Sequence, residues 1–215
     1  HLSIKNFRGI KNLDWTITED MVCLIGRGDS TKSTILDAIH MALLPRWNPS
    51  FTDVDFYESD IKAPIEIIAT VGHLPDALLS LDKFGNYLRG WSDDGLVDEP
   101  EDGVESVLSI ALRVDSSLEP RWSVVNDREP EGKSISHIER KKLGATWVGT
   151  YVDQDLSWGK LSALTRLSGD EEDISTVLAD ASRKAREAVA DAELESLNKA
   201  AEDAGEIAKS FGVQP

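Results

Sequence analysis

Residues 26–34 read GRGDSTKST, and their spacing matches the phosphate-loop pattern G-x-x-x-x-G-K-[ST] at all but one position. In such a loop, backbone N–H groups and the positive end of the following helix hold a phosphate. We expect Lys32 to reach the β- and γ-phosphates as the catalytic lysine, Ser33 to hold Mg²⁺, and Thr34 to bond an α-phosphate oxygen. The predicted cofactors are therefore ATP and Mg²⁺. The predicted nucleotide-binding residues of this loop are Gly26, Arg27, Gly28, Asp29, Ser30, Thr31, Lys32, Ser33 and Thr34.

One position departs from the pattern, because Thr31 stands where the second glycine is expected. A β-branched side chain is stiff and bulky next to its own backbone. If the position needs a positive φ, threonine costs about 1–2 kcal/mol, which corresponds to binding weakened about tenfold. Gly28 can supply some of the lost freedom. An ordinary glycine-rich turn remains the alternative, but the register of Lys32 and its two hydroxyl neighbours favours the phosphate loop.

The elements that must position the loop follow from hydrophobic periodicity. The continuous apolar run at residues 21–25, MVCLI, predicts a strand buried on both faces. Apolar residues at helical spacing predict an amphipathic helix that Pro45 ends; they are Ile35, Leu36, Ile39, Ala42 and Leu43. Alternation predicts an N-terminal hairpin, with Leu2, Ile4 and Asn6 on one face of its first strand and Leu13, Trp15 and Ile17 on one face of its second. Strand, loop and helix then follow one another as a phosphate loop requires.

The rest of the chain alternates between strands and loops before it turns helical. We expect a strand at residues 64–71, a short helix near residues 74–81, an exposed loop at 92–103, a hairpin over 106–126, and a strand at 145–152. From Asp170 onward, one or two long amphipathic helices are predicted. Their packed face would carry Leu178, Ala181, Ala185, Ala188, Ala192 and Glu195 and would need a partner helix or further chain. The predicted domains are residues 1–168 and 169–215.

Composition narrows the function classes. The 215 residues carry a formal net charge of −16, whereas residues 1–50, with six Lys/Arg and five Asp/Glu, carry +1. An acidic body disfavours non-specific nucleic-acid binding, so any contact with DNA is expected through other parts of the protein. The lone cysteine, Cys23, lies in an apolar run and predicts a core residue, no disulfide framework and a cytoplasmic location. No apolar run approaches the roughly 18 residues of a membrane span.

Two other constellations are weaker. The acidic group Asp53, Asp55, Glu58 and Asp60 could be imagined as a two-metal nuclease site. No histidine or lysine accompanies it and no predicted strand presents it, so a solvated loop is the better interpretation. The four histidines are scattered and form no metal-ligand spacing.

A resemblance covers residues 2–71 and returns at about 145–167. The segment LSIKNFRGIKNLDWTI, followed by MVCLIGRGDSTKSTILDAI, resembles the opening of ABC-type ATPase heads, including the chromosome-maintenance (SMC) and RecF-like ATPases. The segments FTDVDFYESDIKAPIEI and YVDQDLSWGKLSALTRL look like ATPases of the OLD family. The resemblance implies an α/β fold: the N-terminal lobe of an ABC-type head, with antiparallel hairpins around a mixed sheet and long C-terminal helices. It implies Mg·ATP-driven dimerisation that gates a Toprim nuclease elsewhere in the protein, in phage defence.

The resemblance also carries two residues outside the loop. Arg8 aligns with an arginine that contacts nucleotide phosphate in related heads, and a surface turn residue is the alternative. Gln154 aligns with a glutamine that senses Mg²⁺ and the attacking water, which makes it a catalytic and metal-site candidate; a solvent-facing residue is the simpler account.

Two motifs of such heads are missing. LSGDEE, at residues 167–172, imitates the signature loop, but a charged helical stretch follows it, so Ser168 or Asp170 is expected to cap a helix. VLSIALRVD imitates a Walker B strand, but its single Asp favours a hairpin strand. We therefore expect no hydrolysis by this chain alone and association into at least a dimer, with a partner subunit possible. The alternatives are a DNA-repair ATPase of the RecF or SMC type, or a non-hydrolysing structural or dimerising module whose loop Thr31 has weakened.

Overall fold

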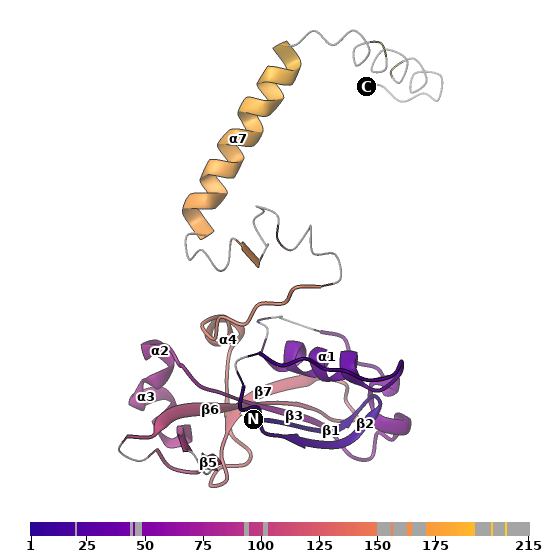
Figure 1. Cartoon of the computed structure of the whole chain (residues 1–215), viewed down its shortest axis with the longest axis vertical. Helices are drawn as coiled ribbons and strands as arrows, with labels where there is room; N and C mark the ends of the chain where they lie inside the picture. Colours follow the sequence, from indigo (N-terminus) through magenta and orange to yellow (C-terminus); the bar gives the residue numbers. More distant parts are fainter. Residues whose placement is uncertain are drawn as a thin grey trace. The chain divides into compact units, whose positions relative to one another are not determined.

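The computed structural model describes residues 1–19, 21–43, 45, 49–92, 95–100, 103–149, 156, 163–164, 171–191, 199 and 205. The chain divides into two compact units, His1–Trp147 and Val148–Pro215. The first unit holds a sheet with the helices α1 to α4, and the second holds α7 (Figure 1). The predicted domain boundary at residues 168/169 stays a prediction.

The first unit is built on an eight-stranded sheet of order β2-β1-β3-β6-β4-β5, in which β7 pairs with β6 and β8. The strands are β1 Leu2–Phe7, β2 Ile10–Trp15, β3 Ile65–Val71, β4 Arg89–Ser92, β5 Gly95–Val97, β6 Glu105–Val114, β7 Pro120–Val125 and β8 Lys133–Ser134. Every pair among the described strands is antiparallel, so the predicted mixed sheet is wrong for this part of the chain. Parallel neighbours need a long crossover, and the long connection through α1 instead returns the chain as β3 antiparallel to β1.

The N-terminal hairpin is confirmed, with β1 and β2 in register from Leu2 opposite Trp15 to Phe7 opposite Ile10. Leu2 and Ile4 are buried as predicted. Asn6 does not continue this face, because it takes a left-handed backbone (φ 55°) and its amide donates to the carbonyls of Asp60 and Ala63. Phe7 enters the core in its place.

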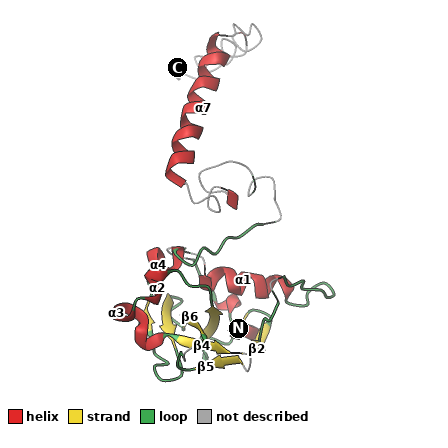
Figure 2. Ribbon diagram, turned by 60° about the vertical axis from the view of Figure 1, so that its left-hand side comes forward, coloured by secondary structure: helices red, strands yellow, loops and turns green. Residues whose placement is uncertain are grey.

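Helix α1, Lys32–Leu43, lies along one face of the sheet and contacts β1, β3 and β6 (Figures 1 and 2). Its fully buried residues are Ala38 and Ala42, whose small side chains let the helix backbone approach the strands closely. Ile35, Ile39 and Leu43 flank them and are partly buried, as predicted. Leu36 was placed in the same stripe and is 44% exposed, because it lies almost opposite Ala38 at 100° per residue.

The remaining predicted elements of the first unit are confirmed in part. Helix α2, Asp76–Leu79, confirms the short helix, and β6 with β7 confirms the hairpin. The exposed loop at 92–103 is wrong in part, since β5 pairs there with β4. Residues 145–149 form no strand, and 150–152 lie outside the described residues. Two further helices are α3, Leu81–Phe84, and α4, His137–Lys141, whose Ser136 and Glu139 form a capping box.

The second unit contains α7, Glu171–Asp191, a helix of 21 residues. Asp180 forms an ion pair with Lys184 one turn later, at 2.9 Å. Ala181, Ala185 and Ala188 of the predicted packed face are exposed in this chain. Alanine buries little apolar area, and the face was predicted to need a partner helix or further chain, so its packing stays a prediction. Ser168, Asp170, Ala192 and Glu195 lie outside the described residues. None of the described helices has the length and apolar content to cross a membrane.

Candidate functional site

The loop before α1 folds around the ammonium group of Lys32. Lys32 Nζ donates to the carbonyl of Gly26 at 3.0 Å, to Ser30 Oγ at 2.8 Å and to the carbonyl of Arg27. Ser30 Oγ in turn donates to the Arg27 carbonyl at 2.8 Å. Residues 26–30 are exposed. The loop therefore presents a lysine held by neutral oxygens at the protein surface.

The helix that follows the loop offers an anion its positive end. Helix α1 begins at Lys32 and has no acidic residue in its first turn. The first N–H groups of a helix lack partners within it, and the helix dipole favours negative charge there. Ser33 is exposed and Thr34 is half-buried in this turn. A phosphate next to these hydroxyls would meet the helix N–H groups and Lys32 together.

Thr31 adopts the conformation that makes its side chain costly, with φ at 61°. Asp29 is also left-handed, with φ at 57°. Gly28 is not among the glycines with positive φ and a Cβ there would meet no atom within 4 Å, so the expectation that Gly28 supplies the freedom is wrong. Gly26 is the more crowded glycine, since a Cβ there would lie 2.6 Å from Ser30 Oγ and the hydroxyl would have to move.

The turn between β1 and β2 packs against the loop. A Cβ on Gly9 would lie 2.9 Å from Thr31 Cγ2, which is too close for an ordinary contact. A cavity of about 250 Å³ opens at this junction, lined among others by Gly9, Asn12, Thr31, Ile35 and Tyr57. Sequence reasoning missed this junction, because nothing in the spacing of Gly9 and Thr31 indicates that they meet.

Arg8 lies in the same turn, with a left-handed backbone (φ 47°). Its Nη1 donates to Asp37 Oδ2 at 2.6 Å and its Nε to Asp55 Oδ1 at 2.9 Å. Burial alone would lower the pKa of Arg8, but the hydrogen bonds and charges of Asp55 and Asp37 outweigh it and raise that pKa. The phosphate contact predicted for Arg8 stays a prediction, and the two carboxylates are partners that the sequence did not indicate.

The other predicted site residues are placed as follows. Gln154 lies outside the described residues. Of the acidic group at residues 53–60, Asp55 is engaged by Arg8 and by Thr52. Among the described residues, no three His, Cys, Asp or Glu side chains gather as metal ligands.

The apolar run before the loop differs from its prediction. Residues 21–25 form no strand, and Met21 and Ile25 are 86% and 93% exposed. Cys23, expected in the core, is exposed. An apolar run becomes a buried strand only when strands on both sides pair with it, and no described strand pairs with this one.

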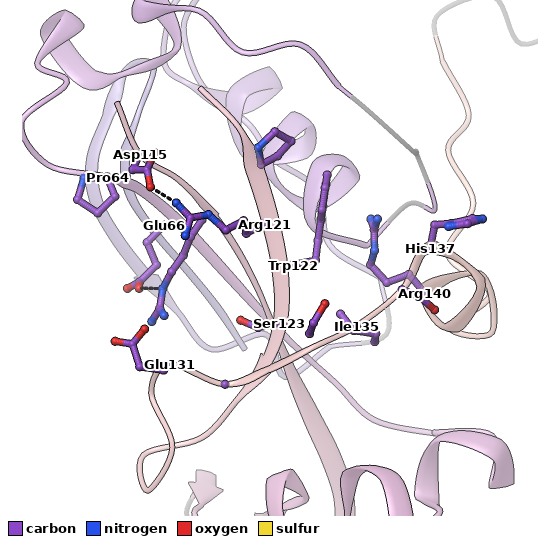
Figure 3. A pocket seen from close by; sticks show the side chains of 15 residues that line it. Pro64, Glu66, Asp115, Arg121, Trp122, Ser123, Glu131, Ile135, His137 and Arg140 are labelled. Carbon is purple, nitrogen blue, oxygen red and sulfur yellow. Dashed lines mark hydrogen bonds and ion pairs between the residues drawn. The ribbon is translucent and has the colours of Figure 1, made fainter. Parts of the chain in front are cut away.

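A larger cavity, of about 870 Å³, opens beside β7 and holds three arginines. Arg121 pairs with Asp115 on one side of the strand, and Arg113 Nε donates to Glu66 at 2.8 Å (Figure 3). On the other side, Arg140 stacks on Trp122 at 4.0 Å, and burial lowers its pKa to about 10. The described contacts of these arginines include a carboxylate or an aromatic ring in each case.

Comparison with known proteins gives little beyond the structure itself. No family model matches the chain, and no curated protein matches it. One solved structure, from work on the ATP-driven dimerisation and DNA-stimulated activation of SMC ATPases, is 15% identical. The match covers 83% of this chain and 95% of that one, with a TM-score of 0.44. A TM-score at this level does not establish a shared fold.

Proposed function

We propose that this chain binds Mg·ATP through residues 26–34. The observation that carries the proposal is the folding of the loop around Lys32, at the N-terminus of a helix whose first turn has no acidic side chain. Neutral oxygens hold Lys32 in place without cancelling its charge. A bound phosphate can then take up the ammonium together with the free helix N–H groups.

Each residue of the loop has a proposed contact with one part of the ligand. Lys32 contacts the β- and γ-phosphates, Ser33 holds Mg²⁺ and Thr34 bonds the α-phosphate. The cavity at the junction with the β1–β2 turn has Ile35 and Tyr57 in its lining, which gives the nucleoside apolar and aromatic surface. Arg8 contributes a further cation and Gln154 senses Mg²⁺ and the attacking water.

The finer proposal places this chain in an OLD-like ATPase. Nucleotide binding brings two copies together and gates a Toprim nuclease elsewhere in the protein, in phage defence. The sequence resemblance supports it, and so does the exposed apolar run at residues 21–25, a surface that a completing lobe or subunit would cover. Hydrolysis requires groups from such a lobe or subunit to polarise the attacking water.

A non-hydrolysing module is the second candidate. One observation favours it: the strained Thr31, with φ at 61°. Such a module would bind nucleotide weakly and serve in assembly.

Calorimetry with Mg·ATP tests the proposal on wild type, Lys32→Ala and Thr31→Gly. Lys62→Ala is the matched control, because Lys62 is an exposed lysine outside the loop. Binding by wild type and Lys62→Ala, loss in Lys32→Ala, and binding about tenfold tighter in Thr31→Gly are expected. Equal binding by wild type and Lys32→Ala would contradict the proposal that residues 26–34 bind the nucleotide. Sedimentation with and without Mg·ATP tests the association of two copies.

A further inference from the structure

The two carboxylates that bind Arg8, those of Asp55 and Asp37, differ in how firmly other groups hold them in place. Asp55 is 13% exposed at its side chain, and its Oδ2 also accepts from Thr52 N at 3.0 Å and from Thr52 Oγ1 at 3.1 Å. Its backbone carbonyl accepts from the Arg8 N–H at 2.7 Å. Asp55 is therefore fixed on the short helical turn η1, Asp53–Asp55, whether or not Arg8 is bound to it.

Asp37 has no comparable anchor. It projects from α1 with its side chain 38% exposed, and within the described part of the chain its carboxylate accepts a hydrogen bond from Arg8 alone. An ion pair between two partly exposed groups stabilises a protein only slightly. The contact between Arg8 Nη1 and Asp37 can thus be exchanged at small cost, while the contact between Arg8 Nε and Asp55 stays.

Arg8 lies in a turn next to the loop, so an exchange of its partner bears on what the loop binds. A Cβ built on its neighbour Gly9 would lie 2.9 Å from the methyl carbon of Thr31, the residue directly before Lys32, so this turn lies next to the loop. Arg8 itself is held at φ 47°, a conformation that non-glycine residues adopt rarely and that is retained where the surroundings impose it. A guanidinium bonds carboxylate and phosphate oxygens with the same donor geometry, so a phosphate at the loop competes for the same N–H groups as Asp37.

We propose that Asp37 is an internal competitor for the ligand of the loop. In the nucleotide-free protein, Asp37 accepts a hydrogen bond from Arg8 Nη1. When a phosphate group binds, its oxygen replaces Asp37 as the partner of Arg8, while Asp55 keeps the guanidinium oriented. The exchange breaks the ion pair between α1 and the β1–β2 turn. Nucleotide binding is thereby opposed by a contact within the protein, and the loop is tuned by a residue that never touches the ligand. This proposal rests on the proposed function of the loop.

The test is a double-mutant cycle on Mg·ATP affinity, with wild type, Asp37→Asn, Arg8→Gln and the double variant. Asp37→Asn is expected to bind about two- to fivefold more tightly, which is the worth of a partly exposed ion pair. The gain is expected to vanish in the Arg8→Gln background. Asp55→Asn, the matched carboxylate control, is expected to bind more weakly because Arg8 loses its orientation. Thermal unfolding checks that each variant is folded.

Three results would overturn the exchange. Unchanged or weaker binding by Asp37→Asn is one. A second is an equal gain in the Arg8→Gln background, which would mean that Asp37 acts only by repelling the phosphates. The third is no Mg·ATP binding by any variant, which removes the proposed function as well. Binding that requires Lys32 but ignores Asp37 removes the exchange alone.

Discussion

Two places in the first unit gather cations, and they differ in what the cations meet. In the loop before α1, the described contacts of Lys32 are all to neutral oxygens. In the cavity beside β7, Arg113 and Arg121 meet Glu66 and Asp115 (Figure 3). This cavity is larger than the one at the junction of the loop with the β1–β2 turn, yet Arg113 and Arg121 are already paired with carboxylates. On the proposed function, the comparison indicates that the partners of its cations and the N–H groups at a helix start mark an anion site, rather than cavity size or the number of cations.

The largest effect expected from a change in loop geometry is that of Gly26→Ala, and Gly28→Ala is its matched control. Gly26→Ala would place a Cβ 2.6 Å from Ser30 Oγ, so the hydroxyl must move and its bonds with Lys32 and the Arg27 carbonyl are lost. Two hydrogen bonds at about 1 kcal/mol each correspond to Mg·ATP binding weakened about thirtyfold. Gly28→Ala meets open space and is expected to bind within about twofold of wild type. Calorimetry measures both, and equal losses in the two variants would contradict the loop geometry.

The second effect concerns the junction between Gly9 and Thr31. Gly9→Ala creates a contact of 2.9 Å with Thr31 Cγ2, and overpacking of this kind lowers the free energy of unfolding by about 1–3 kcal/mol. In the Thr31→Gly background the methyl group is absent, so Gly9→Ala should then cost little. Urea unfolding of the four proteins measures the coupling. An undiminished cost in the Thr31→Gly background would show that the turn does not press on this methyl group.

The third effect concerns the paired charges beside β7. Glu66 accepts from Lys5 at 3.0 Å and from Arg113 at 2.8 Å. Burial would raise the pKa of Glu66, but these two cations outweigh it and lower that pKa. A lowered carboxyl pKa gives stability that is present above the ordinary value of about 4.3 and is lost as the pH falls through the folded value.

Glu66→Gln is therefore expected to lower the free energy of unfolding by about 1 kcal/mol at pH 7. At pH 3 the difference from wild type should shrink. Urea unfolding at the two pH values measures it, with Glu119→Gln, a change at an exposed carboxylate, as control. A difference that is the same at both pH values would mean that the ionised form of Glu66 contributes nothing.

The smallest expected effect is none. Arg121→Ala removes a cation from the cavity beside β7, and Mg·ATP affinity should stay within about twofold of wild type because Arg121 is already paired with Asp115. A loss like that of Lys32→Ala would place the nucleotide in the cavity and reverse the comparison.

Local patterns predicted the elements that need only neighbours in sequence or a simple face. The hairpin of β1 and β2, the helix α1 and the hairpin of β6 and β7 all follow from periodicity. The run at residues 21–25 shows the limit, because its sequence is as apolar as a buried strand and no described strand pairs with it. Asn6 shows a second limit of periodicity. Its side chain leaves the face of Leu2 and Ile4 and donates to the carbonyls of Asp60 and Ala63, which lie 54 and 57 residues along the chain.

The candidate site was predictable in its loop and not in its surroundings. The register of Lys32 and Ser33 follows from a motif. The strain at Thr31 was predicted for the case that this position has a positive φ, and its φ is 61°. The partners of Arg8 come from α1 and from η1, 29 and 47 residues along the chain. No spacing rule connects such distant positions, so Asp37 and Asp55 emerge only from the structure.

The most direct test of the account is the backbone amide spectrum of the chain, recorded by nuclear magnetic resonance with and without Mg·ATP. The account predicts that the amide signals of residues 26–34 shift and become protected from exchange with solvent. Those of β7 and β8, beside the larger cavity, should stay unchanged. Shifts that gather at β7, or no shift in the loop at saturating Mg·ATP, would contradict the claim that residues 26–34 bind the nucleotide.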